Sequence, residues 1–246
     1  MAPRDRIHII VPSTGLAERF TPHLRNIPRR SEPILTDRAD HGTALGLALR
    51  SAEAEGRERR AQRTVRVEGA IDGIYLVFES FPGLNLALES LDPRVGKRHP
   101  ELRAVQEVAV DGKVVERVTV FVPDGTLGYF LQRLEQYVGA AADGKTRHAA
   151  LVDRIQTIEL ASLQELWTDP RSKFPGEGER VWWEVWLRRR DGSEKERFHD
   201  FAAKAHLRTG RLALGFEDRT VLVVEATAAE LVGALEVTWA LDIACP

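Results

Sequence analysis

The most constraining feature of this chain is one order of strands and helices that occurs twice along it. In the first copy, strand patterns cover Ile74–Glu79, Leu102–Val110, Lys113–Val122 and Ile155–Leu160. A short helix is expected over Pro82–Leu91, and an amphipathic helix runs from Leu127 to Val138. Asp111-Gly112 separates the two middle strands, and this dipeptide favours a type I′ hairpin turn because both positions require positive φ.

The same order recurs in fewer residues between positions 179 and 246. Its strands are expected over Val181–Leu187, Arg211–Phe216, Thr220–Ala226 and Leu241–Cys245. Ser193-x-x-Glu196 and Thr227-x-x-Glu230 are capping-box patterns, and each is expected to open a helix. The chain therefore contains two copies of one strand-helix-strand-strand-helix-strand order.

This order predicts an α+β protein built from two tandem ferredoxin-like (βαββαβ) units. An extended arm and a long helix are expected before them. Pro22, Pro28 and Pro33 interrupt any regular pattern in the arm, whereas Ala and Leu recur at three- and four-residue steps between Thr36 and about Arg63. The predicted domains are 1–64 (arm and helix), 65–168 (first unit with a linker helix) and 179–246 (second unit).

Two tryptophans in the second unit are candidates for binding a partner. Trp182 and Trp186 lie on the strand face opposite its predicted core stripe. They could pack against the linker helix, which a capping box at Ser162-x-x-Glu165 opens and which continues through Trp167. Alternatively, they form an exposed anchor for a protein partner, because Trp is enriched at binding hot spots.

Composition and charge argue against several classes of partner and compartment. The formal net charge of -2 favours neither nucleic acid nor an anionic membrane, and the run Arg57–Arg63 contains Glu58, as a solvated helix end does. No stretch approaches the ~18 apolar residues of a transmembrane helix, and Ile7–Val11 is too short for the core of a signal peptide. Cys245 is the single cysteine, so no internal disulfide can form. We predict a cytoplasmic protein.

The sequence lacks the combinations of residues that catalysis requires. There is no Gly-x-Ser-x-Gly elbow, and Cys245 has no neighbour in the sequence that would lower its pKa. Asp-His-Gly-Thr at 40–43 matches the histidine motif of subtilisin-like peptidases, but the companion Asp-Thr-Gly and Gly-Thr-Ser motifs are absent. We interpret this match as coincidence within a surface helix.

Metal and carboxylate sites are not favoured either. His199 and His206 are seven residues apart, whereas a chelating pair on a helix is more often four apart. Asp72, Glu79 and Glu89 could pair in space, but no motif supports them, and we interpret them as surface charges. We predict no catalytic residue, no metal site and no cofactor.

Three segments of the chain carry a resemblance to a known family. They are YLVFESFPGLNLALESL at 75–91, ALVDRIQTIELASLQELWTD at 150–169 and WWEVWLR at 182–188. They resemble the N-terminal region of large bacterial subtilisin-like serine peptidases, which are typically encoded next to an AAA-type ATPase and are associated with phage defence. The resemblance covers nearly the whole chain and includes no catalytic motif.

The resemblance implies a non-catalytic pro-region or regulatory module that folds, inhibits or positions a subtilisin-like peptidase domain, in cis or in trans. Subtilisin pro-regions are similar βαββαβ units that pack on the peptidase and lay their C-terminal residues in its substrate cleft. By this analogy the cleft contacts would be Leu241, Asp242, Ile243, Ala244, Cys245 and Pro246. The alternative is an adaptor that docks the peptidase to the AAA-type ATPase or to a phage-derived trigger.

Overall fold

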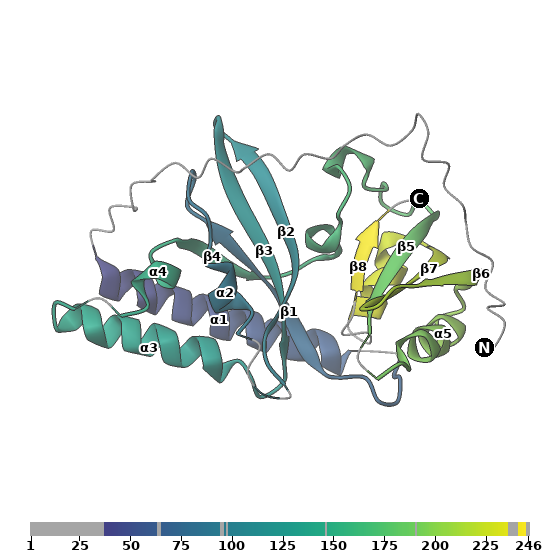
Figure 1. The fold of residues 1–246 in the computed structure, drawn as a ribbon, viewed down its shortest axis with the longest axis horizontal. Helices are drawn as coiled ribbons and strands as arrows, with labels where there is room; N and C mark the ends of the chain where they lie inside the picture. Colours follow the sequence, from purple (N-terminus) through teal and green to yellow (C-terminus); the bar gives the residue numbers. More distant parts are fainter. Residues whose placement is uncertain are drawn as a thin grey trace, which may run out of the picture. The chain divides into compact units, whose positions relative to one another are not determined.

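The computed structural model describes residues 37–62, 65–93, 96, 98–145, 147–189, 191–235 and 241–244 (Figure 1). These residues form an α+β structure with two four-stranded antiparallel sheets. The expected N-terminal arm lies outside the described residues. The described residues belong to one compact unit, and the division at 65–168 and 179–246 stays a prediction.

The first sheet has the strand order β2-β3-β1-β4, and its neighbouring strands are all antiparallel. Its strands are β1 (Gly73–Ser80), β2 (Glu101–Val110), β3 (Lys113–Pro123) and β4 (Ile155–Leu160). They lie where the sequence predicts, because long period-2 patterns bounded by turns define strands well. Asp111 and Gly112 have φ values of 49° and 73°, which confirms the predicted turn with two positive φ angles.

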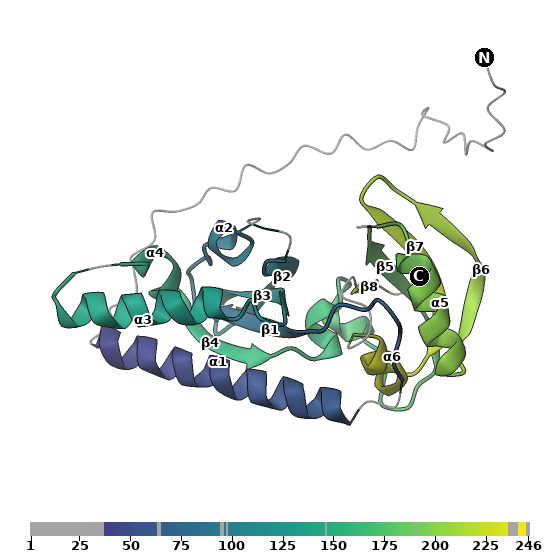
Figure 2. The same ribbon diagram turned by 90° about the horizontal axis from the view of Figure 1, so that it is seen from below.

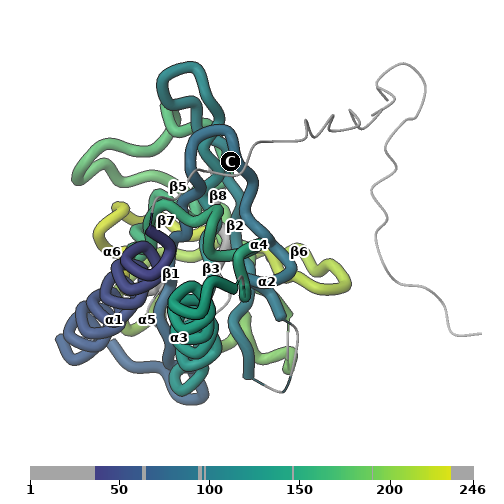
Figure 3. Tube along the Cα trace, turned by 90° about the vertical axis from the view of Figure 1, so that its left-hand side faces the viewer, coloured from purple at the N-terminus to yellow at the C-terminus, as the bar shows by residue number. Residues whose placement is uncertain are grey.

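Two long helices cover one face of this sheet, α1 (Arg38–Ala61) and α3 (Gly128–Ala142). They lie side by side along the sheet (Figures 2 and 3). Leu45 and Leu49 of α1 and Leu134 of α3 are buried in one cluster with Leu76 and Phe78 of β1. The helix α1 thus shares its core with the first sheet, although the sequence pattern predicts a separate N-terminal segment for it.

The short helix predicted over Pro82–Leu91 is wrong for most of its length. Only α2 (Leu88–Leu91) is helical there, and α4 (Ala149–Val152) is a second single-turn helix before β4. Gly83 has φ of 84°, and the Leu84 N–H donates to the Phe81 carbonyl at 3.0 Å. The Pro-Gly pair therefore forms a turn, which an apolar spacing of three and four residues does not reveal.

The linker between the sheets contains two 3₁₀ turns, η1 (Leu163–Leu166) and η2 (Arg171–Lys173). The capping box of Ser162 and Glu165 is confirmed, although it opens a 3₁₀ turn rather than an α-helix. The Thr119 hydroxyl donates to the Glu165 carbonyl at 2.9 Å, and Gln106 Nε2 donates to the Trp167 carbonyl at 2.7 Å. These bonds hold the linker on strands β2 and β3.

The second sheet repeats the arrangement, with the order β6-β7-β5-β8 and antiparallel neighbours. Its elements are β5 (Val181–Arg188), α5 (Glu194–Lys204), β6 (Arg208–Gly215), β7 (Arg219–Ala226), α6 (Ala228–Leu235) and β8 (Leu241–Ala244). Phe198 and Phe201 of α5 and Leu231 of α6 are buried against Trp183 and Val185 of β5. Both helices therefore pack on the same face of this sheet.

The two predicted capping boxes of the second half have different outcomes. The Thr227 box is confirmed, because Thr227 N–H donates to Glu230 Oε2 at 2.8 Å and Glu230 N–H to Thr227 Oγ1 at 3.3 Å. The Ser193 box is wrong, because the Ser193 hydroxyl donates to Asp191 Oδ1 at 2.7 Å and caps no helical N–H. Ser193 has φ of -101° and ψ of 11° rather than the extended backbone of a typical N-cap residue, so its hydroxyl oxygen accepts from no N–H group in the first turn of α5.

One apolar cluster joins the two sheets. Tyr75, Val77 and Phe121, on the face of the first sheet that turns away from α1, belong to the same cluster as Trp183. Trp167 of the linker lies in this cluster, with ring centroids 5.6 Å from Trp183 and an interplanar angle of 81°. The halves therefore share this cluster, whereas the cluster beneath α1 and α3 contains residues of the first half alone.

Candidate binding surface

The outward face of the second sheet follows from the alternation of side chains in β5. Trp183, Val185 and Leu187 are fully buried on the core face, so Trp182 and Trp186 lie on the opposite face. The register continues that face across the sheet, because Trp186 is paired with Val221 and Val221 with Leu214. We call Trp182, Trp186, Leu214 and Phe216 the aromatic face.

Trp186 and Phe216 form the centre of the aromatic face. Their rings are stacked with centroids 5.8 Å apart and an interplanar angle of 8°. Trp186 Nε1 donates to Glu184 Oε2 at 3.4 Å, which satisfies the polar atom of the indole. Phe216 is 48% exposed and Leu214 is 58% exposed, so this stack presents apolar surface to solvent.

Trp182 lies on the same face and is 37% exposed. The guanidinium carbon of Arg208 is 5.6 Å from the centroid of a Trp182 ring, a cation–π distance. Arg208 Nη1 also forms an ion pair with Glu225 Oε2 at 2.5 Å, and Glu225 is the cross-strand partner of Trp182. The aromatic face therefore has a charged margin, an arrangement typical of protein interfaces.

The interpretation that Trp182 and Trp186 pack against the linker is wrong. Trp167 of the linker makes edge-to-face contacts with Trp183 and with Phe174 instead. The linker packs on the core face of β5, and strand alternation directs the other two tryptophans away from it. Their role as an anchor for a partner stays a prediction.

The C-terminal segment lies beside the aromatic face. Leu241–Ala244 form β8, an edge strand that pairs with β5 from Leu187 to Glu184. Asp242 is paired with Trp186, so its register position is on the side of the aromatic face. Cys245 and Pro246, the last two predicted cleft contacts, lie outside the described residues.

A buried ion network links the two halves and was not found from the sequence. Glu101 Oε2 lies 2.7 Å from Arg103 Nη2 and 3.3 Å from Arg188 Nη1, and the Glu101 and Arg103 side chains are each 2% exposed. Burial lowers the pKa of Arg103 to about 10. Charged residues two apart in a strand ordinarily indicate a solvated face, so no sequence signal reveals this burial.

A second polar cluster that sequence reasoning missed anchors the start of α1. Arg38 Nη2 pairs with Asp153 Oδ2 at 2.7 Å, and the Tyr137 hydroxyl donates to Asp153 Oδ1. Burial is the main cause that raises the pKa of Tyr137 well above its usual range, and the hydrogen bond to Asp153 and the negative charge of Asp153 raise it further. In the sequence, Tyr137 belongs to the apolar stripe of its helix, which conceals the polar role of its hydroxyl.

The peptidase-like tetrapeptide at 40–43 has local partners in the first turns of α1. His41 Nε2 lies 3.2 Å from the Val152 carbonyl oxygen, and the Thr43 hydroxyl donates to the Ala39 carbonyl at 2.8 Å. Gly42 is buried, and a Cβ there would lie 2.7 Å from a ring carbon of Tyr137. The expectation of a surface helix is therefore wrong for Gly42, which provides the close approach between α1 and α3.

The other candidate groups do not come together in the described part of the chain. No group of three His, Cys, Asp or Glu side chains among the described residues could hold a metal ion. His199 is half-buried and His206 is exposed. Glu79 Oε2 lies 3.0 Å from Arg117 Nε, so its partner is a cation rather than a second carboxylate. Within the same residues, none of the helices combines the length and the apolar character needed to cross a bilayer.

Comparisons with known proteins add little to this geometry. No family model matches the sequence, and no curated protein matches it. A solved structure described as an unknown protein from Galdieria sulphuraria is similar over 66% of this chain and 89% of that chain, with 12% sequence identity and a TM-score of 0.25. A likeness at this TM-score supports no conclusion about fold or function.

Proposed function

We propose that this chain is a non-catalytic pro-region or regulatory module that binds a subtilisin-like serine peptidase domain. The aromatic face is the observation that carries the proposal. Large rigid side chains such as Trp and Phe dominate the energetics of protein interfaces. Stacking of Trp186 on Phe216 fixes both rings before a partner arrives, so little side-chain entropy is lost on binding.

The fold proposed for this module is a tandem of ferredoxin-like units. The strand orders β2-β3-β1-β4 and β6-β7-β5-β8, both antiparallel, support it. Helices follow the first and third strand of each sheet, which also agrees with a βαββαβ order. Pro-regions of subtilisins resemble such units, and this likeness supports the functional proposal by analogy alone.

The position of the C-terminal segment agrees with a pro-region role. In a pro-region the C-terminal residues lie in the substrate cleft while the sheet packs on the peptidase surface. Here β8 adjoins β5, and Asp242 is the register partner of Trp186. A peptidase domain seated on the aromatic face would therefore be next to the described part of the C-terminal segment, Leu241–Ala244.

The test is inhibition of the subtilisin-like peptidase domain encoded with this chain, in the same reading frame or in a neighbouring one. The purified chain is titrated into the peptidase while cleavage of a chromogenic peptide is recorded. We expect binding and a change in cleavage rate, both lost in a double variant with Trp182→Ala and Phe216→Ala. Leu47→Ala is the matched control, because Leu47 lies on α1 and is 65% exposed.

Absence of binding and of any change in cleavage rate would contradict the proposal, as would equal losses in the double variant and in Leu47→Ala. The adaptor alternative gives a different pattern. It predicts that the chain captures the AAA-type ATPase and leaves the peptidase rate unchanged. In that experiment Trp186→Ala should reduce recovery of the ATPase, and unchanged recovery would argue against the aromatic face as the docking site.

A further inference from the structure

The outer edge of the first sheet is a second surface with the geometry of a binding site. β4 is the last strand in the order β2-β3-β1-β4, so one of its edges has no neighbouring strand among the described elements. The Ala161 N–H donates to the Tyr75 carbonyl at 2.8 Å. Alternation along an antiparallel ladder then directs the N–H and C=O groups of Ile158 and Leu160 outward.

A groove of about 600 Å³ runs along this edge, between β4 and α1. The β4 wall is the continuous stretch from Gln156 to Leu160. The α1 wall contains four small side chains, Ala44, Ala48, Ser51 and Ala52, together with Leu45 and Glu55. These small residues leave room beside the strand, and the outward backbone groups supply donors and acceptors along the same line.

The helix and the strand that form the groove run in the same direction. Arg38, at the start of α1, pairs with Asp153, which lies two residues before β4. At the other end, a Cβ on Gly56 would lie 3.4 Å from Leu160 Cδ1. Ser51 therefore lies near the middle of the groove, and Glu55 and Glu159 lie near the same end of it.

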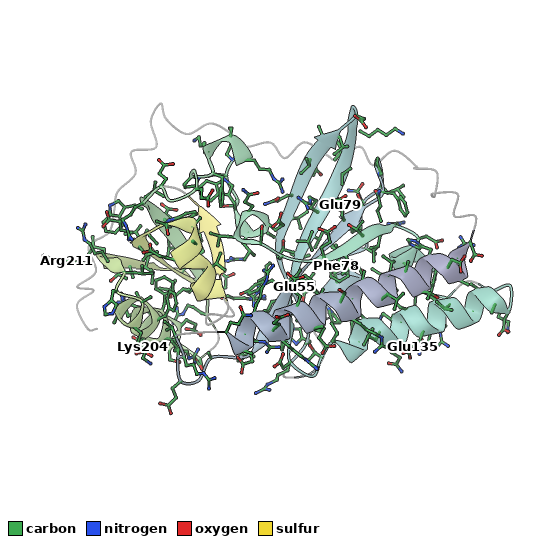
Figure 4. The ribbon with its side chains drawn as sticks, turned by 180° about the vertical axis from the view of Figure 1, so that it is seen from behind. Glu55, Phe78, Glu79, Glu135, Lys204 and Arg211 are labelled. Atoms are coloured by element: carbon green, nitrogen blue, oxygen red, sulfur yellow. The ribbon has the colours of Figure 1, made fainter. Side chains whose placement is uncertain are left out.

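The walls of the groove differ on the two faces of β4. Ile158 belongs to the core cluster beneath α1 and Leu160 packs against it, so side chains of an added strand on that face would meet Ala48 and Ser51. On the other face, alternation places Glu159 beside the added strand. Glu55, labelled on α1 in Figure 4, adds a second carboxylate at that end, although it also pairs with Arg59 at 2.5 Å.

We infer that the groove between β4 and α1 binds an extended peptide segment of a protein partner by strand addition. The segment carries small aliphatic side chains toward α1 and basic side chains toward Glu159. Its backbone continues the sheet beyond β4, and a stretch of about five residues fills the edge at ~3.3 Å per residue. This inference is independent of the proposed peptidase contact, which uses the other sheet.

The probe is an acetylated, amidated heptapeptide of alternating valine and lysine, labelled with a fluorophore and titrated with the full chain. Fluorescence anisotropy should show saturable binding that weakens as salt is added. Two matched peptides serve as comparisons. Replacing lysine by glutamate should weaken binding, and methylating alternate backbone nitrogens, which removes the N–H donors toward β4, should abolish it.

Variants of the chain locate the peptide. Ser51→Trp should block the groove, whereas Ala54→Trp places the same side chain on an exposed position of α1 outside the groove lining and should bind like the parent chain. Glu159→Lys should weaken binding of the valine–lysine peptide about fivefold and strengthen binding of the valine–glutamate peptide. Unfolding midpoints of all variants, measured in urea, show whether each one is folded.

Several outcomes would overturn the inference. It fails if neither the valine–lysine nor the valine–glutamate peptide binds at millimolar concentration, or if the N-methylated peptide binds as well as the valine–lysine peptide. It also fails if folded Ser51→Trp and folded Ala54→Trp bind the valine–lysine peptide equally well. Sedimentation equilibrium addresses a second copy as the occupant. A dimer of the chain that Ser51→Trp disrupts would assign the edge to self-association and would equally refute the peptide site.

Discussion

At the scale of single residues, the buried side chain of Asp153 is stabilised by hydrogen-bond donors from two helices. Its side chain is 3% exposed and accepts from Arg38 and from the Tyr137 hydroxyl. We expect Tyr137→Phe to lower the free energy of unfolding by about 1–3 kcal/mol, because a buried charged acceptor loses a donor. Urea unfolding at pH 7 measures it. The half-buried hydroxyl of Tyr129 donates to the Ser90 carbonyl, and Tyr129→Phe should lower the free energy of unfolding by less. Equal losses of stability in the two variants would contradict the role of Tyr137.

Asp191 gives a pH-dependent contribution to stability. Hydrogen bonds from the hydroxyl and backbone N–H of Ser193, together with the charge of Arg197, lower its pKa to about 2. Because the pKa in the folded state lies below the unfolded value of about 3.9, the ionised carboxylate stabilises the fold above about pH 4, and this stability is lost as the pH falls toward 2. Asp191→Asn should therefore lower the melting temperature at pH 7, with a difference that narrows between pH 4 and pH 2. A difference that does not change with pH would contradict this assignment.

Residue-level prediction from the sequence succeeded where alternation alone decides the outcome. The period of two in β5 predicts that Trp182 and Trp186 lie opposite the core stripe, and the burial of Trp183, Val185 and Leu187 agrees with it. It could not place Tyr137 beside Asp153 or Arg103 beside Glu101. Those contacts depend on how separate elements pack together. In the sequence, Tyr137 looks like a member of an ordinary apolar helix stripe, and Glu101 and Arg103 look like residues on a solvated strand face.

At the scale of elements, two glycines of α1 have opposite environments. A Cβ at Gly56 would lie 2.4 Å from Ile74 Cγ2, whereas a Cβ at Gly46 would have nothing within 4 Å. Gly46→Ala should stabilise the chain by about 0.5–1 kcal/mol through helix propensity. Gly56→Ala should destabilise it by about 1–3 kcal/mol, because α1 must move away from β1. Thermal unfolding of both variants tests this, and a stabilising Gly56→Ala would contradict the packing.

The elements themselves were largely predictable, because strand periodicity, a two-residue hairpin turn and capping boxes are local signals. The failures have local causes too. The Pro82-Gly83 turn replaces most of a predicted helix, and the backbone conformation of Ser193 is not the extended one of a typical capping residue. The shared core and the groove beside β4 could not be predicted, because they depend on the placement of α1 and the linker against the sheets.

At the scale of the whole molecule, Trp167 couples the two sheets. It is 1% exposed and lies in the cluster that contains both Tyr75 and Trp183. We expect the parent chain to unfold in one calorimetric transition and Trp167→Ala to lose about 3–5 kcal/mol of stability. Trp182→Ala, at a 37% exposed position, should cost much less. Two separate transitions in the parent chain would contradict a shared core.

The most direct test of the central claim is photo-crosslinking from the aromatic face to the peptidase domain. A benzophenone amino acid is introduced at Phe216, which is 48% exposed, and in a second sample at Leu47, which is 65% exposed. After irradiation of each complex, mass spectrometry identifies the attached peptides. The account predicts attachment to the peptidase domain from position 216 and none from position 47. Attachment from position 47 alone, or from neither position in a complex that demonstrably forms, would contradict it.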